Sequence, residues 1–220
     1  MHELRHMLDA KKQQIELTLD GLFEDVRSAI DGAVACLVQR DPDYCRSLID
    51  NDARLNDKRW LIEQDCLVAI ASQQPVAHDL RDIVADMRIA TELERMGDYA
   101  SDIASSVLEL DGGHLEDLGL SDLLAMSTLC LRMLSDAQLA HKNGDAALAR
   151  RLAATDDELD DRLKRVVSST LAAMRSDPLK VDNGSRMLWI AHNLERCGDR
   201  ATNIGEQVIY RVEGVVEELD

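Results

Sequence analysis

The sequence predicts an all-α fold: two tandem, internally duplicated three-helix bundles with six long helices. Three observations support this prediction, namely the composition, the spacing of helix-breaking segments, and a hexapeptide that occurs twice. Aromatic residues make up 3% of the chain, and proline occupies only three of its 220 positions. Strands favour aromatic and β-branched residues, and sheets need many turns, so this composition favours helices.

Breaker segments divide the first half into three helices. The segment RDPDY at 40–44 ends the first helix, and QQPVA at 73–77 ends the second. We expect Pro75 in the first turn of the third helix, because proline suits that position. The third helix ends at a glycine-containing stretch, so residues 1–111 form the first predicted repeat.

The second half has the same rhythm. Residues 112–119 form a predicted glycine-containing linker, and residues 120–220 form the second repeat. KNGDA at 142–146 and SDPLKVDNGS at 176–185 divide this repeat into three further helices. Such regular punctuation is typical of a duplicated helical unit.

The last helix of each half carries the strongest evidence for duplication. IATELERMGDYASDIA at 89–104 aligns without gaps on IAHNLERCGDRATNIG at 190–205, with nine identities in sixteen positions. The middle helices match more loosely, with DNDARLND at 50–57 on ATDDELDD at 154–161. The offsets are 101 and 104 residues, so the connecting loops differ slightly in length.

Both last helices also carry an apolar seam, in which apolar residues recur at spacings of four and three. The seam residues are Ile89, Leu93, Met96, Ala100, Ile103 and Val107 in the first copy, and Ile190, Leu194, Cys197, Ala201, Ile204 and Val208 in the second. On this pattern Glu94 and Asp98 lie outside the core of their own bundle. We therefore expect any site built from them on the bundle surface.

The hexapeptides LERMGD and LERCGD each contain two carboxylates four residues apart. Glu94 and Asp98, like Glu195 and Asp199, are neighbours on one helical face, about 5–6 Å apart. Like charges at this spacing oppose helix formation by a few tenths of a kcal/mol, unless a cation lies between them. Oxygen ligands suit hard ions such as Mg²⁺, Mn²⁺ and iron. With 42 acidic residues in the chain, however, a single such pair also fits a solvated helix face.

The repetition of further residues favours the metal site. Gly97 and Gly198 each cost the helix about 1 kcal/mol relative to alanine, which indicates close approach by a ligand or by another helix. Asp52 and Asp156 interrupt the apolar seams of the middle helices. The oxygen-bearing stripe then continues to Asp102 in the first copy, and to Asn203 and Glu206 in the second.

Charge and cysteine content limit the cellular setting. The formal net charge is −17, which disfavours nucleic-acid binding and suits a cation or a basic protein partner. The five cysteines contain no Cys-x-x-Cys pair, so we expect reduced and mostly buried thiols. No apolar run is long enough for a signal peptide or a membrane span. We expect a soluble, cytoplasmic protein without direct membrane insertion.

The combination of QQPVAHDLR at 73–81 with the two L-E-R-x-G-D motifs resembles the PhoU family of bacterial phosphate-uptake regulators. The resemblance covers essentially the whole chain. It implies two similar three-helix bundles and a cytoplasmic protein, often a homodimer, that catalyses no reaction. It further implies negative regulation of the phosphate-starvation response, with the phosphate ABC transporter ATPase and a phosphate-sensing histidine kinase as partners.

The resemblance also implies divalent or trivalent metal ions on surface carboxylate clusters, with iron, zinc, magnesium and manganese as candidates. The ligands carried over by position are Asp52, Asn56, Glu94, Asp98 and Asp102 for the first cluster, and Asp156, Asp160, Glu195, Asp199 and Asn203 for the second. His192 lies near the second motif, but Thr91 replaces it in the first copy, so we interpret His192 as structural.

Two alternatives remain open at this point. One is a metal-dependent enzyme of the carboxylate di-iron type, although that class uses inward-facing Glu and Glu-x-x-His ligands, and no Glu-x-x-His accompanies these motifs. The other is a structural dimer in which the acidic pairs are only solvated surface. The sequence has no Ser/His/Asp constellation, P-loop or glycine-rich nucleotide signature, so we expect no enzymatic activity.

Overall fold

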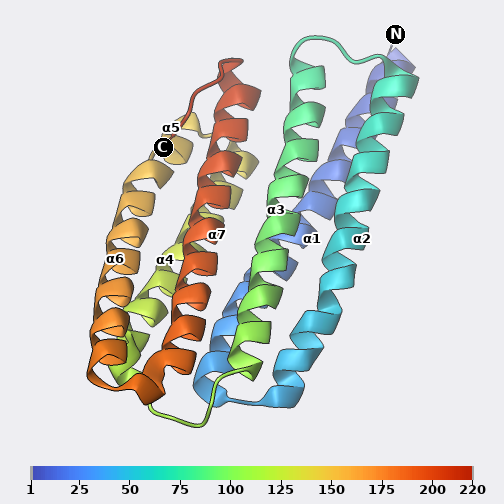
Figure 1. Cartoon of the computed structure of the whole chain (residues 1–220). Helices are drawn as coiled ribbons and strands as arrows, with labels where there is room; N and C mark the ends of the chain where they lie inside the picture. The colour runs from blue at the N-terminus through green and yellow to red at the C-terminus, as the bar shows by residue number, and fades with distance from the viewer. Residues whose placement is uncertain (1, 220) are drawn as a thin grey trace.

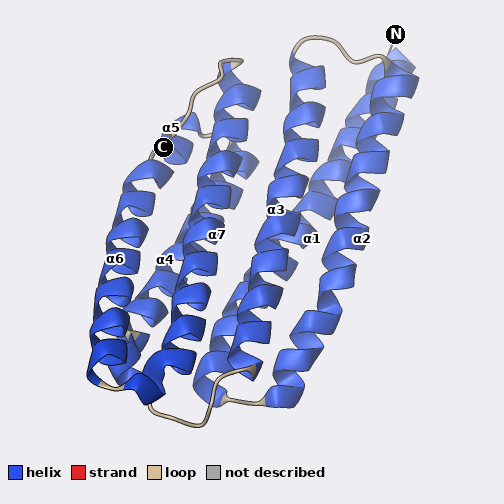
Figure 2. Cartoon of the chain, in the orientation of Figure 1, coloured by secondary structure: helices blue, strands red, loops and turns tan. Residues whose placement is uncertain are grey.

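The chain folds entirely into helices and connections over the described part, residues 2–219 of a computed structural model (Figure 2). Six long helices form two three-helix bundles, which confirms the predicted fold class (Figure 1). The first bundle contains α1 (His2–Gln39), α2 (Pro42–Gln73) and α3 (His78–Leu108); the second contains α4 (Leu120–Asn143), α6 (Leu152–Ser176) and α7 (Val181–Glu213). None of the described helices combines the length and the apolar character that a membrane span requires.

Three short elements supplement the long helices: α5 (Ala146–Arg150) and the 3₁₀ turns η1 (Glu116–Leu118) and η2 (Pro178–Lys180). The helix α5 forms because Asp145 caps its first turn, accepting a hydrogen bond from the Leu148 N–H at 2.8 Å. The sequence pattern did not predict this extra turn between the first two helices of the second bundle.

Pro75 does not lie in the first turn of α3, so that prediction is wrong. The preceding helix α2 ends at Gln73, and its C-cap residue Gln74 is left-handed (φ 47°) and donates its N–H to the Ile70 carbonyl. The chain then needs the residues up to Ala77 (φ 50°) to reverse direction. Proline stands at a helix start instead at Pro42, directly after Asp41, whose carboxylate accepts from the N–H groups of the next turn.

The predicted seams form the core. Every seam residue of α3 and α7 is at most 7% exposed, and all five cysteines are free and buried, as expected. Buried residues of both bundles join in one contiguous hydrophobic cluster. The two halves therefore share a core, and whether the boundaries at 111 and 120 delimit independent domains stays a prediction.

The bundles meet where α3 packs against α7 and α1 against α4. Figure 1 shows that α3 and α7 run in opposite directions side by side, with α2 and α6 flanking them. At this interface the Cys197 thiol lies 4.0 Å from the Met96 carbonyl oxygen, and these two residues hold matching places in the two hexapeptides. The duplicated helices thus pair by an approximate two-fold relation.

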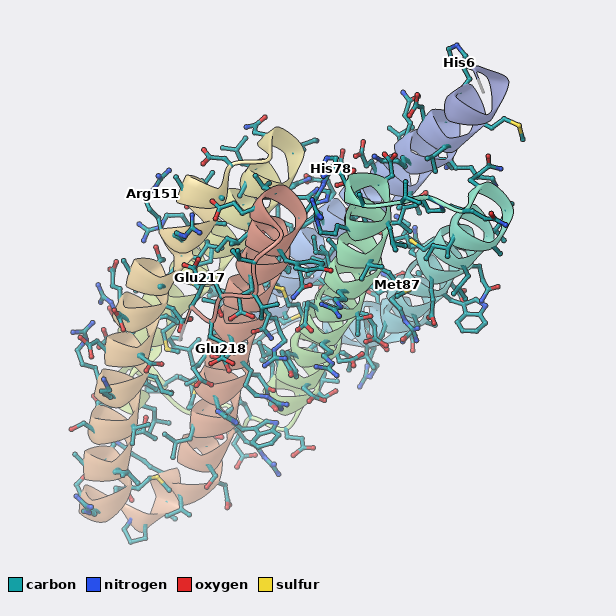
Figure 3. All side chains as sticks on the ribbon, turned by 90° about the horizontal axis from the view of Figure 1, so that it is seen from above. His6, His78, Met87, Arg151, Glu217 and Glu218 are labelled. Atoms are coloured by element: carbon teal, nitrogen blue, oxygen red, sulfur yellow. The ribbon has the colours of Figure 1, made fainter. Side chains whose placement is uncertain are left out.

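A buried polar network joins the bundles at the end where α3 begins, which Figure 3 marks with His78. His141 of α4 is 4% exposed, and its Nε2 lies 2.7 Å from Asp86 Oδ1 of α3 and 2.7 Å from Arg211 Nη1 of α7. Arg211 also pairs with Asp82, which accepts from Lys12 as well. These contacts link α1, α3, α4 and α7, so they fix one bundle against the other.

Candidate metal centres

The two motif glycines admit the middle helix of each bundle. A Cβ placed on Gly97 would collide with Leu55 Cδ1, and one placed on Gly198 would collide with Leu159 Cδ2. Leu55 and Leu159 are matched by the 104-residue offset, which confirms the alignment of the middle helices. The glycines are therefore explained by helix packing, and that packing brings α2 and α6 alongside the motifs.

The first cluster lies where α2 approaches α3. Burial, followed by the neighbouring charges of Glu94, Asp52 and Asp102, raises the pKa of Asp98 to about 6. The pKa of Asp52 is also raised, first by burial and then by the charge of Asp102, while the neighbouring Asp98 carboxyl group opposes the rise. Carboxylates from the two helices thus share one electrostatic environment.

Two α2 side chains border this first cluster. The Asn56 amide donates to Asp52 Oδ2 at 3.2 Å, while Asp52 Oδ1 is buried and meets no hydrogen-bond partner. Arg59 Nη2 lies 4.0 Å from Glu94 Oε1, and the same guanidinium pairs with Glu63. One cluster oxygen therefore lacks a partner, and a positive charge stands at the edge of the cluster.

The second cluster repeats the arrangement where α6 approaches α7. Burial, followed by the charges of Asp199, Asp160 and Glu195, raises the pKa of Asp156 to about 7. Asp156 Oδ1 would lie only 2.9 Å from a Cβ on Gly198, so this carboxylate lies directly over the glycine. The second cluster is electrostatically the more strained of the two, because a higher pKa means a less favourable charged form.

Glu195 shows that strain most clearly. Burial, followed by the charges of Asp199 and Asp160, raises its pKa to about 7 against the opposing charges of Arg196 and Arg200. Its Oε2 atom is buried without a hydrogen-bond partner. His192 Nδ1 lies 3.2 Å from that oxygen, and the two atoms form no hydrogen bond.

The carboxylates are less exposed than the seam pattern suggested. They lie outside the apolar core, as predicted, but the Glu94 side chain is only 17% exposed and that of Glu195 only 21%. The approach of the middle helix covers them, whereas the heptad pattern of one helix only indicates which side faces its own core.

Asn203 has a different environment from the other predicted ligands. Its amide donates to Glu92 Oε2 of α3 at 3.2 Å, and Arg200 binds the same oxygen at 3.1 Å. Glu206, farther along the stripe, accepts from the backbone N–H of Leu219 at 3.1 Å. The end of the second stripe is thus engaged by the neighbouring bundle and by the C-terminal segment.

The sequence prediction missed Arg59 and the position of His192. The two copies differ at both positions. In the repeat alignment Leu163 matches Arg59, and Thr91 matches His192. The positions that are identical in the two repeats indicate the carboxylate chemistry that both clusters share. Mismatched positions beside them mark where the two clusters differ.

The electrostatics of the two clusters suit a metal ion, but their side chains do not form a complete ligand set. Each cluster contains a buried carboxylate oxygen without a donor and a carboxyl group whose charged form is disfavoured, so a cation would relieve both. Among the described residues, however, no three His, Cys, Asp or Glu side chains already converge as a ligand set. The clusters are electrostatically suited to a hard cation, and their ligand geometry is not preassembled.

The fold and the clusters together define a class: a duplicated helical-bundle protein with two carboxylate-lined helix junctions and a shared core. The family model described as PhoU domain matches residues 19–107 and 123–208, one match per bundle. The chain belongs to the PhoU domain family.

Full-length relatives agree with this assignment. A protein of Streptococcus pneumoniae named phosphate-specific transport system accessory protein PhoU homolog is 29% identical, over 99% of this chain and 100% of its own. A Clostridium acetobutylicum protein of the same name is 30% identical, over 98% of this chain and 99% of its own.

Solved structures agree as well. The crystal structure of the phosphate transport system regulatory protein PhoU from Streptococcus pneumoniae has a TM-score of 0.90 at 28% identity, covering 96% of this chain and 100% of that one. The crystal structure of PhoU from Pseudomonas aeruginosa has a TM-score of 0.88 at 27% identity, covering 94% of this chain and 99% of that one.

Proposed function

We propose that this protein is a non-catalytic, metal-binding adaptor that regulates phosphate uptake. The observation that carries the proposal is the pair of carboxylate clusters, each with a buried oxygen that lacks a donor. These clusters occur in a chain whose full-length relatives are named accessory proteins of phosphate-specific transport systems. A cation bound at each cluster neutralises the carboxylates and changes the charge that the helix junction presents.

The ligands in this proposal are the carboxylates that share each cluster. Asp52, Glu94, Asp98 and Asp102 would hold the first ion, with Asn56 beside them, and Asp156, Asp160, Glu195 and Asp199 would hold the second. Asn203 is a weaker candidate, because its amide already serves Glu92. Magnesium, manganese, iron and zinc are the candidate ions, since carboxylate oxygens accept all of them.

The proposed partners are the ATPase of a phosphate ABC transporter and a phosphate-sensing histidine kinase, met in the cytoplasm by a homodimer. In this role the protein is a negative regulator of the phosphate-starvation response. The net charge of −17 supports docking to basic surfaces on those partners. Such docking is expected to weaken as ionic strength rises.

The geometry does not favour the di-iron enzyme. Di-iron carboxylate centres take inward-facing ligands from four helices of one bundle. Here each cluster draws on two helices and lies outside the apolar seam.

Isothermal titration of the full chain with Mn²⁺ tests metal binding. Glu94→Gln with Asp98→Asn is expected to remove the first site, and Glu195→Gln with Asp199→Asn the second, each leaving the other site titratable. Glu24→Gln with Asp31→Asn is the matched control, because it removes two exposed carboxylates from α1. Equal Mn²⁺ binding by all three double variants would contradict the proposed ligands.

Binding to the purified transporter ATPase tests the adaptor role. We expect association that weakens on chelation of metal and on raising the salt from about 50 to about 500 mM. Absence of binding in the presence of Mn²⁺ would contradict the transporter as a partner, without affecting the metal sites.

A further inference from the structure

The outer face of α2 carries exposed apolar side chains. Among the described elements α2 packs only against α1 and α3, and Figure 1 shows it at the outer edge of the first bundle. The face that points away from both carries Trp60, Leu61, Leu67 and Val68, each between 47% and 56% exposed. Trp60 and Leu67 are about two helical turns apart, as are Leu61 and Val68. These four residues form one stripe along the helix, which we call the α2 stripe.

The matching face of α6 is charged, although α2 and α6 are copies of each other. Lys164 holds the position of Trp60, and Arg165 that of Leu61, with side chains 71% and 51% exposed. The α6 face shows that the fold does not require apolar residues at these positions. A contiguous exposed apolar surface that the fold does not need marks an interaction site.

The free charge beside the α2 stripe is negative. Residues 60–80 contain three acidic residues and neither lysine nor arginine. Asp57 and Asp65 are exposed, and neither forms an ion pair with another described residue. The basic residues that precede the stripe are paired with carboxylates or lie more than one turn before it, namely Lys58, Arg59 and Arg54. A docked partner is therefore expected to be basic.

Neither a second copy of this surface nor an anionic lipid fits. Glu63 and Asp65 flank the centre of the stripe, so a two-fold pairing of α2 with α2 would bring these carboxylates close to their own copies. The negative surface of a lipid bilayer repels the same carboxylates. The heptad spacing of the apolar side chains is instead that of a surface on which another helix packs lengthwise.

Resting on the adaptor role proposed above, we infer that the α2 stripe docks an amphipathic helix of a partner protein. The apolar face of that helix covers Trp60 and Leu67, and its lysine or arginine side chains pair with Asp57 and Asp65. Indole and leucine side chains supply apolar contact area, and the carboxylates fix the register and orientation of the helix. The first bundle thus carries a docking surface that the second lacks.

Tryptophan fluorescence of the full chain tests this inference directly. With Trp189→Phe, Trp60 is the only tryptophan left, since the chain contains two. The probe is a synthetic helical peptide with leucine at the a and d heptad positions and lysine at the others. We expect saturable binding and a shift of the Trp60 emission to shorter wavelength. The same peptide with glutamate in place of lysine is expected to bind at least about tenfold more weakly.

Substitutions within the stripe separate it from the general acidity of the protein. In the same background, Leu61→Gln with Leu67→Gln retains Trp60 as the reporter and is expected to weaken binding of the lysine peptide about 10- to 100-fold. Val38→Gln with Leu179→Gln is the matched control, because these two side chains are 61% and 91% exposed elsewhere. It is expected to change binding less than about twofold, with thermal unfolding used to confirm that both variants are folded. Equal binding by the stripe variant and the control would overturn the inference.

Charge reversal supplies a readout that loss of folding would not produce. Asp57→Lys with Asp65→Lys is expected to weaken binding of the lysine peptide about tenfold and to strengthen that of the glutamate peptide by a similar factor. Unchanged affinity for both peptides would contradict the pairing with Asp57 and Asp65.

Sedimentation velocity and co-sedimentation with anionic phospholipid vesicles test the other occupants. Self-association or vesicle binding that disappears in the variant with Leu61→Gln and Leu67→Gln would contradict a partner helix. All peptide titrations contain a chelator and no transporter ATPase. A failure of the docking surface is therefore distinct from a failure of the metal sites or of the ATPase as a partner.

Discussion

The α2–α3 and α6–α7 junctions of this protein share the same packing contact and differ in the residues beside their carboxylates. In both, a motif glycine receives a leucine of the middle helix and brings carboxylates of two helices together. The pKa nevertheless rises to about 6 at Asp98 of the first cluster and to about 7 at Asp156 and Glu195 of the second. The differing pairs are Asn56 and Asp160, Arg59 and Leu163, Thr91 and His192, and Asp102 and Asn203.

This comparison shows which features duplication preserves. The glycine–leucine contact determines how closely the middle helix approaches, so a change there disturbs both packing and carboxylate placement. Edge residues lie outside that glycine–leucine contact and differ between the two copies. The framework thus positions the site, and the edge adjusts its charge and donor set.

The substitution with the largest expected effect on stability tests whether the two bundles unfold as one cooperative unit. Arg211→Met leaves the buried Asp82 and Asp86 without their shared guanidinium, which is expected to lower the free energy of unfolding by about 3–5 kcal/mol. Because the network and the core span both bundles, we expect one cooperative thermal transition at a lower temperature. Arg175→Met, at an exposed position of α6, is the control. Two separate transitions in the unsubstituted chain would show that the bundles unfold independently.

The next effect tests the shared framework. Gly97→Leu and Gly198→Leu each force the middle helix outward, and each is expected to lower the free energy of unfolding by about 3 kcal/mol. The corresponding fall in Tm is about 6–12 °C. Gly112→Leu is the control, because no atom lies within 4 Å of a Cβ built there. A Gly198→Leu protein as stable as the control would contradict the packing role of the motif glycine.

The pH dependence distinguishes the two clusters. Asp98, Asp156 and Glu195 have folded-state pKa values above their usual range near 4, so the native protein binds more protons than the unfolded chain between about pH 4 and 7. The free energy of unfolding of the metal-free protein is therefore expected to fall as pH rises through this window. The loss is on the order of 1 kcal/mol after allowing for partial exposure, or about 2–4 °C in Tm.

The second cluster is expected to contribute most of that slope. Asp156→Asn with Glu195→Gln should flatten the change in Tm between pH 5.5 and 7.5, and Asp98→Asn should flatten it less. Thermal unfolding in the presence of a chelator measures both. A metal-free protein that becomes more stable toward pH 7.5 would contradict the raised pKa values.

The substitution with the smallest expected effect on stability gives the first cluster the acidic residue that the second cluster has at the matching position. Asn56→Asp replaces the amide that donates to Asp52 with a like charge four residues away, which is expected to cost a few tenths of a kcal/mol. Asp160→Asn should stabilise the second bundle by a similar amount. Urea unfolding of the metal-free variants measures the difference, and shifts of the same sign in both would contradict the assigned environments.

The sequence predicted the fold because the evidence for it was periodic and repeated. The spacing of helix-breaking residues and the apolar seams depend on the local geometry of a helix. The two hexapeptides show that both halves of the chain carry the same pattern. The role of Gly97 remained open between a ligand and a helix, because only three-dimensional packing shows that Leu55 lies against it.

Long-range contacts account for what the sequence did not predict. Asn203 binds Glu92 across the bundle interface, between residues far apart in the chain, so no spacing rule indicates that contact. The partial burial of Glu94 likewise depends on how closely α2 approaches α3. The apolar seam of a single helix does not determine the distance between α2 and α3.

Crystallography of the full chain soaked with Mn²⁺, with anomalous scattering to locate the ions, tests the central claim most directly. We predict an anomalous peak within about 2.6 Å of carboxylate oxygens of Asp52 and Asp98 at the first junction, and of Asp156 and Asp199 at the second. Mn²⁺ bound only elsewhere on this acidic surface, with both junctions free of metal, would contradict it.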